Sequence, residues 1–190
     1  GDTCVYLSQD SSLAISGHGL GRLKLYDAKT GKYIWTYQRH GIVFNNPNNR
    51  GKRTIRDAEV KSVCISQDNS FILSGGADKT LKLWEIGKHG SMRAVLSGDC
   101  LRTVVGHQGE VLSVCLSLDN QLALSGSGDK TLKVWEVATG RCLNTMEGHG
   151  NSVNAVCIFS DAKLALSGSA DNTIKFWNLE TAECLRNFQG

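Results

Sequence analysis

Histidine, serine and aspartate recur in this sequence at spacings that repeat after 42 residues. With a tryptophan they form two matching sets: His107, Ser125, Asp129 and Trp135, and His149, Ser167, Asp171 and Trp177. A serine, a histidine and an aspartate brought together could make an activated nucleophile with its base and an orienting carboxylate. An enzyme needs one such group rather than two. A buried chain of hydrogen bonds that satisfies every polar atom explains both copies better.

The segments around these residues repeat as a unit. Residues 106–137 return almost intact as residues 148–179. A fixed period in this range is typical of propeller blades, because one repeat cannot bury its faces without neighbours. Short apolar or β-branched runs separated by turns fall at 111–117, 122–127, 132–137 and 142–147. Such runs are too short for helices, so the sequence predicts an all-β fold whose blades are sheets of four antiparallel strands.

The order Gly-His, Ser-Gly-Ser, Asp and then a strand ending in Trp resembles the WD40 repeat family. This resemblance implies a β-propeller whose blades share a buried network of His, Ser, Asp and Trp. In a further repeat the corresponding residues are Ser74, Asp78 and Trp84. The resemblance covers essentially all of residues 1–190 as one propeller segment, with blades at about 1–38, 56–105, 107–147 and 149–190 and insertions at 39–55 and 87–98.

Family members usually close a ring of about seven blades, and closure removes the open sheet edges. Four blades therefore predict an open arc that belongs to a larger ring. The alternative is that two copies close a ring of eight.

The first two blades depart from the pattern. Leu20 and Tyr26 stand where the family has Asp and Trp, so we expect blade 1 to lack the polar network. Such a blade would be held by packing alone or would adjoin something that alters it. Eighteen residues before Ser74, the spacing from His107 to Ser125, stands Arg56. We therefore expect the network of blade 2 to lack its histidine.

The insertion at 39–55 is rich in asparagine and contains the single proline of the chain. Its composition predicts an exposed loop on the face where the histidine loops emerge. Candidate partner-binding residues within it are Phe44, Arg50, Lys52 and Arg53, which would suit an acidic partner. The alternative is a solvated loop that binds nothing. The second insertion, 87–98, is expected on the opposite face.

The family resemblance also implies partner contacts three and five residues after each histidine position. At these positions, counting from His107, His149 and Arg56, are Glu110 and Leu112, Ser152 and Asn154, and Glu59 and Lys61. We expect these side chains at the rim of the central channel.

Composition narrows the alternatives further. A net charge of +3 in 190 residues does not by itself indicate nucleic acid, and no apolar run is long enough to span a membrane. Seven cysteines without a Cys-x-x-Cys pair predict free, buried thiols in a reducing, cytoplasmic compartment, with no metal and no cofactor.

The sequence therefore predicts a non-catalytic scaffold or sensor module that binds other proteins, part of a larger signalling protein. Two alternatives stay open. The basic stretch 39–56 could bind RNA or DNA, and the open blade edges could serve self-assembly.

Overall fold

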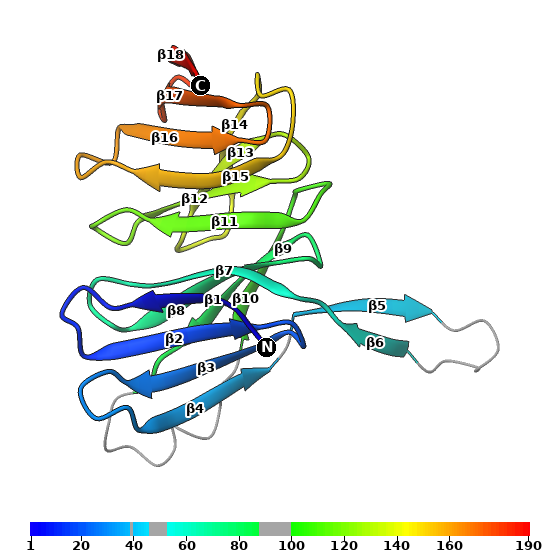
Figure 1. The fold of residues 1–190 in the computed structure, drawn as a ribbon, viewed down its shortest axis with the longest axis vertical. Helices are drawn as coiled ribbons and strands as arrows, with labels where there is room; N and C mark the ends of the chain where they lie inside the picture. Colours follow the sequence, from blue (N-terminus) through cyan, green and yellow to red (C-terminus); the bar gives the residue numbers. More distant parts are fainter. Residues whose placement is uncertain (39, 46–52, 88–99) are drawn as a thin grey trace.

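The structure is a computed structural model that describes residues 1–38, 40–45, 53–87 and 100–190 of the chain. Within these ranges every regular element is a β-strand, and sixteen of the eighteen strands form four antiparallel sheets of four (Figure 1). The predicted all-β fold of four-stranded blades is confirmed.

Each sheet is one blade, and its strands follow one another in the chain. Blade 1 contains β1 (Asp2–Leu7), β2 (Leu13–His18), β3 (Arg22–Asp27) and β4 (Tyr33–Gln38). Blade 2 contains β7 (Val60–Ile65), β8 (Phe71–Gly76), β9 (Thr80–Glu85) and β10 (Cys100–Val105). Blade 3 contains β11 (Val111–Leu116), β12 (Leu122–Ser127), β13 (Leu132–Glu136) and β14 (Cys142–Met146). Blade 4 contains β15 (Val153–Ile158), β16 (Leu164–Ser169), β17 (Thr173–Asn178) and β18 (Cys184–Gln189).

The blades stack face to face in chain order, with the first strands β1, β7, β11 and β15 adjacent in space. A separate apolar core fills each of the three seams. Trp84 of blade 2 shares one core with Leu13 and Ile15 of blade 1, and its ring lies 6.0 Å from that of Tyr37. Trp135 and Trp177 lie in the cores of the next two seams. Each tryptophan thus joins its own blade to the preceding one by removing a large apolar surface from water.

The Ser-Gly pair in each second strand follows from this stacking. A side chain at Gly75 would come within 2.6 Å of Val111, and one at Gly126 within 2.7 Å of Val153, both on the next blade. Glycine is needed because the second strand passes directly against the first strand of its neighbour.

One apolar face of blade 4 is not covered by another blade in the structure. Ile174 and Phe188 of blade 4 are 51% and 49% exposed, whereas the equivalent Leu132 and Met146 of blade 3 are fully buried. The sequence repeat thus specifies the same apolar face in both blades, and a following blade covers only one of them.

The first insertion is more ordered at its ends than expected. β5 (Gly41–Asn45) and β6 (Arg53–Asp57) pair in antiparallel register and form a two-stranded ribbon that extends away from the blades (Figure 1). The expectation of a loop over 39–55 is wrong for these flanks, because β-branched and aromatic residues on both sides of the asparagines pair as strands. Nearly all of the second insertion, residues 88–98, lies outside the described residues.

Candidate functional site

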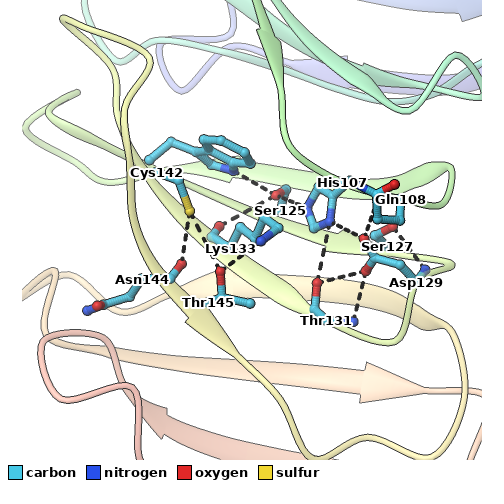
Figure 2. Close-up of polar contacts among 11 residues, drawn as sticks. His107, Gln108, Ser125, Ser127, Asp129, Thr131, Lys133, Cys142, Asn144 and Thr145 are labelled. Carbon is cyan, nitrogen blue, oxygen red and sulfur yellow. Dashed lines mark hydrogen bonds and ion pairs between the residues drawn. The ribbon is translucent and has the colours of Figure 1, made fainter.

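The polar network of blade 3 connects a loop to strands β12 and β13 and to the turn between them (Figure 2). The Nδ1 atom of His107 lies 2.8 Å from Oδ2 of Asp129, and its Nε2 lies 2.7 Å from Oγ of Ser125. The indole N–H of Trp135 donates to the same serine oxygen at 2.8 Å. The histidine is held by the β12–β13 turn on one side and by the β12 strand on the other.

One arrangement of protons satisfies all of these groups. The tryptophan N–H donates to Ser125, the serine hydroxyl donates to Nε2 of His107, and Nδ1–H of the histidine donates to Asp129. Ser125 is completely buried, so the oxygen that would attack a substrate in a hydrolase is enclosed by its own network. The geometry fixes the His107 loop and encloses the Ser125 hydroxyl.

The same network recurs in two other blades. In blade 4, His149 lies 2.9 Å from Asp171 and 2.7 Å from Ser167, and Trp177 donates to Ser167 at 2.8 Å. In blade 2, Trp84 donates to Ser74 at 2.8 Å.

Blade 2 has a histidine after all, so the expectation that it lacks one is wrong. His40, which is completely buried, places Nδ1 2.9 Å from Asp78 and Nε2 2.7 Å from Ser74. Arg56 is exposed on β6. Counting back eighteen residues failed because the insertion lies between His40 and its blade rather than before the histidine. The His40–Gly41 pair was the signal that could have found it, since it repeats the His-Gly order of His149–Gly150.

Blade 1 builds a different, smaller network. His18, on the end of β2, places Nδ1 2.8 Å from Asp2 and Nε2 3.3 Å from Ser16. Of the two alternatives expected for this blade, the one in which packing alone holds it is wrong, because these polar contacts also connect its strands. All three residues belong to strands β1 and β2, so the contacts connect strands within one sheet and reach no neighbouring loop.

Burial and hydrogen bonding set the ionisation of these groups. Burial lowers the pKa of His107 more than neighbouring Asp129 raises it. Burial by itself would raise the pKa of Asp129, but hydrogen bonds from Thr131, from the Gln108 N–H and from His107 outweigh it and hold the pKa below its usual value. The network therefore favours a neutral imidazole beside an ionised carboxylate.

The six rim candidates lie in three pairs, at the starts of the first strands of blades 2, 3 and 4. Each pair flanks a fully buried valine: Glu59 and Lys61 flank Val60, Glu110 and Leu112 flank Val111, and Ser152 and Asn154 flank Val153. Because successive side chains in a strand alternate in direction, both members of each pair face away from the buried valine. We call these six residues the top rim.

Charged groups from two blades meet in the top rim. The Lys61 ammonium lies 2.6 Å from a Glu59 oxygen and 3.6 Å from a Glu110 oxygen. The hydrogen bond with Glu59 raises the pKa of Lys61 above its usual value. Asn154 is exposed, while Leu112 and Ser152 are half-buried.

The other partner candidates lie in the insertion. Phe44 is on β5 and Arg53 is on β6, where the structure describes the backbone. Arg50 and Lys52 fall outside the described residues.

The cysteines only partly match the expectation of buried thiols. All seven are unpaired, and Cys64 is buried, but Cys100, Cys142, Cys157 and Cys184 are exposed. Three of the exposed thiols begin the fourth strands, which form the outer edges of their sheets. Burial raises the pKa of Cys115 to about 12, so this thiol remains protonated.

A second set of contacts between blades was missed from sequence. The Asn69 amide donates to Asp10 of the preceding blade at 2.9 Å, and the Asn120 amide donates to Asp68 at 3.2 Å. Both asparagines have positive φ, 56° and 60°, which asparagine tolerates well. The Asp-Asn pair that recurs in the turn after the first strand of blades 2 and 3 was the available signal. At the same position a serine, Ser11, stands in blade 1 and an alanine, Ala162, in blade 4.

The geometry agrees with the comparisons to known proteins. The family described as "WD domain, G-beta repeat" matches residues 52–85, 98–136 and 140–178, and the chain belongs to the WD40 repeat family. The resemblance inferred from sequence is confirmed.

Three relatives illustrate the similarity. A guanine nucleotide-binding protein subunit beta from Oryza sativa subsp. japonica is 30% identical over 138 residues, covering 72% of this chain and 31% of that protein. A WD repeat domain-containing protein 83 homolog from Dictyostelium discoideum is 28% identical over 138 residues, 72% of this chain and 34% of that protein. Small ribosomal subunit protein RACK1 from Caenorhabditis elegans is 37% identical over 70 residues, 37% of this chain and 22% of that protein. The chain thus spans no more than about a third of these relatives. Within the described ranges, no helix has the length and apolar character needed to cross a membrane.

Proposed function

We propose that this chain is a non-catalytic protein-binding module and that the top rim is its contact surface. The observation that carries the proposal is the meeting of Glu59, Lys61 and Glu110 across the seam between blades 2 and 3. A surface shared by two blades is held rigidly by the buried networks and cores beneath it. A rigid surface binds with less loss of conformational entropy than a loop that must become ordered.

The charges of the rim suit a protein partner. Its described groups are of both signs and include the apolar Leu112 and the amide of Asn154, whereas a nucleic-acid surface would be predominantly basic. Mixed polar and apolar contacts are typical of protein interfaces. Enclosure of Ser74, Ser125 and Ser167 in their networks supports a role without catalysis.

Charge reversal at the rim tests this proposal. The double variant Glu59→Lys/Glu110→Lys should keep the melting temperature of the wild type, because both side chains are partly or largely exposed. It should lose the proteins that the wild type captures from cell extract, quantified by mass spectrometry.

A matched control reverses two glutamates at the opposite end of the sheet. Glu180 and Glu183 lie in the exposed turn between β17 and β18, so Glu180→Lys/Glu183→Lys makes the same change of charge away from the rim. Retention of the captured proteins by the control and their loss from the rim variant is the expected result. Equal capture by both variants would contradict a binding site at the rim.

A further inference from the structure

A pocket with a volume of about 100 Å³ lies at the carboxyl ends of the first strands of blades 1, 2 and 3. Strand β7 lies between β1 and β11 there (Figure 1). Side chains from all three blades line the pocket, among them Tyr6, Cys64, Ile65, Cys115 and Leu116. The top rim occupies the amino ends of β7 and β11, so roughly 20 Å of extended strand separates it from this strand-end pocket.

Contacts between blades fix the shape of the strand-end pocket. The Oδ1 atom of Asn120, one of the lining residues, accepts the N–H of Gln67 at 3.0 Å, and its amide donates to Asp68 at 3.2 Å. These bonds connect blade 3 to blade 2 beside the pocket. The wall residues Cys64 and Ile65 are buried. A pocket held in this way needs little ordering when a ligand binds.

The lining of the strand-end pocket is neutral, since none of the described residues that form it carries a charge. Burial raises the pKa of the Cys115 thiol to about 12 and holds the pKa of Cys64 well above its usual value, so both thiols stay protonated. Burial also raises the pKa of Tyr6, and the nearby thiols of Cys64 and Cys115 add to that shift. A charged ligand would lose its hydration here without gaining an opposite charge. The pocket therefore suits an uncharged group.

Tyr6 adds a hydrogen-bond donor to the strand-end pocket. Its side chain is partly exposed, and its hydroxyl forms no hydrogen bond with another described residue. A protonated phenol donates readily to a carbonyl oxygen.

The size of the strand-end pocket narrows the choice of ligand further. A cavity of about 150 Å³ holds benzene, whereas drug-sized ligands occupy pockets of about 300 Å³ or more. A volume of about 100 Å³ therefore suits a branched aliphatic side chain the size of leucine. The apolar walls formed by Ile65, Val114 and Leu116 favour such a group, because it gains free energy on leaving water.

We propose that the strand-end pocket binds a leucine side chain from an extended peptide segment of a partner protein, with the Tyr6 hydroxyl donating to a peptide carbonyl beside that leucine. This inference rests on the proposed function as a protein-binding module and adds a second contact to it. A partner bound at the top rim reaches the pocket with about six extended residues. Contacts at both ends of the first strands then reinforce each other, since the second forms within an already assembled complex.

The probe for this site is N-acetyl-L-leucine amide, with binding followed by the NMR signals of protein methyl groups. Titration should shift the methyl signals of Ile65, Val114 and Leu116 to a saturating value. Free leucine should bind about tenfold more weakly or less, because its charged amino and carboxylate groups would meet an uncharged lining. N-acetyl-L-aspartate amide should leave the three signals unchanged for the same reason.

Two variants with matched controls test the residues of the mouth. Leu118→Glu should weaken probe binding by about tenfold or more, because it places a charge beside the leucine side chain. Its control, Leu101→Glu on β10, should bind normally, since Leu101 is 53% exposed and Leu118 is 50% exposed. Tyr6→Phe should weaken binding about three- to tenfold, as expected for one hydrogen bond. Tyr33→Phe, which removes an exposed hydroxyl from β4, should have no effect.

Four results would overturn the proposal. Absence of saturable shifts in the wild type would show that the pocket does not take a leucine side chain. Equal binding of free leucine would assign the pocket to a free amino acid instead of a peptide. Unchanged affinity of Leu118→Glu would place the probe elsewhere on the protein. Unchanged affinity of Tyr6→Phe would remove the carbonyl contact and with it the recognition of a peptide.

Failure of this inference can be separated from failure of the proposed function. Glu59→Lys/Glu110→Lys should bind the probe like the wild type, because the rim lies at the other end of the strands. If the wild type does not bind the probe but the rim variant still loses captured proteins, the pocket proposal is wrong and the rim remains the binding site. If the probe binds as expected while the rim variant captures every protein normally, the rim proposal is wrong and the pocket carries the contact.

Discussion

Blades 1 and 3 have the same arrangement of four strands but hold their histidines in different ways. In blade 3, His107 comes from the loop before the sheet and is bound by Asp129 and Ser125, so the network connects the blade to the incoming chain. In blade 1, His18 belongs to the sheet itself and bonds Asp2 and Ser16. The side chain of Asp2 is 51% exposed, whereas that of Asp129 is 11% exposed.

This difference separates the contribution of apolar packing to a blade from that of the polar network. Packing of apolar faces is common to both, since Leu23 and Leu25 of blade 1 are as deeply buried as Leu132 and Val134 of blade 3. The network of His, Ser, Asp and Trp in blade 3 adds to this packing and fixes the loop that enters the blade. A blade can therefore fold without this four-residue network but should then contribute less to the stability of the protein.

Substitutions in blades 3 and 1 should differ most in their effect on the free energy of unfolding at the tryptophan position. Trp135→Ala should lower the free energy of unfolding by about 3–5 kcal/mol, because it opens a cavity in the core between blades 2 and 3 and removes a hydrogen bond to Ser125. Tyr26→Ala, the equivalent change in blade 1, should cost about 1 kcal/mol, since Tyr26 is half-buried and its ring contacts Tyr33. Urea unfolding measures both. Equal losses would mean that the two blades do not differ in this way.

At the carboxylate position, the loss of stability should differ less between a blade with the full network and blade 1. Asp171→Ala should cost about 1–3 kcal/mol, because His149 and the N–H of Gly150 lose an acceptor. Asp2→Ala should cost less than about 1 kcal/mol, since the side chain of Asp2 is 51% exposed and its contact with His18 is open to solvent on that side. Thermal unfolding of both variants at pH 7.5 tests the ranking, and a greater loss from Asp2→Ala would reverse it.

Acid should destabilise the network of blade 3 through both of its titrating groups. The folded-state pKa values of His107 and Asp129 are lowered relative to their ordinary values, so at intermediate pH the unfolded chain binds more protons. Stability therefore falls as pH drops below about 6.5, where an unfolded histidine gains its proton, and continues to fall through the carboxyl range.

The variant His107→Gln isolates the histidine contribution to this acid effect. It should be less stable than the wild type at pH 7.5, and the difference should narrow at pH 5.5 because glutamine does not titrate. Melting temperatures of both proteins across this range give the comparison. A constant difference would contradict a lowered histidine pKa.

Substitutions in the turns that join neighbouring blades should be able to raise the stability of the protein as well as lower it. Asn120→Ala should cost about 1–2 kcal/mol, because alanine is strained at φ 60° and the hydrogen bond to Asp68 is lost. Ala162→Asn should stabilise by about 0.5–1 kcal/mol, since asparagine tolerates φ 55° and its amide would lie beside Asp119, as Asn120 lies beside Asp68. Absence of a gain in thermal stability would show that the seam between blades 3 and 4 does not repeat this geometry.

Restoring the family residues of blade 1 should have the smallest effect. Leu20→Asp/Tyr26→Trp should change stability by no more than about 0.5 kcal/mol, because Leu20 is 61% exposed and the histidine of this blade, His18, already contacts Asp2 and Ser16. A clear rise in melting temperature would show that the two residues suffice to form a network.

The sequence by itself determined the blades and the residues of two complete networks. The shift of 42 residues between His107 and His149 carries this information, because each blade uses the same local strand and turn pattern. The expectation that Glu110 and Leu112, which flank Val111, lie at the rim came from the family resemblance and not from the strand pattern.

Only the tertiary structure assigned His40 to blade 2 and turned the flanks of the insertion into strands. A network joins residues that are adjacent in space, and an insertion changes their separation along the chain without moving the two ends, which Ala58 and His40 hold together. The contacts of Asn69 and Asn120 likewise cross from one blade to another. Sequence periodicity reports what each blade repeats, whereas contacts between blades depend on how the sheets stack.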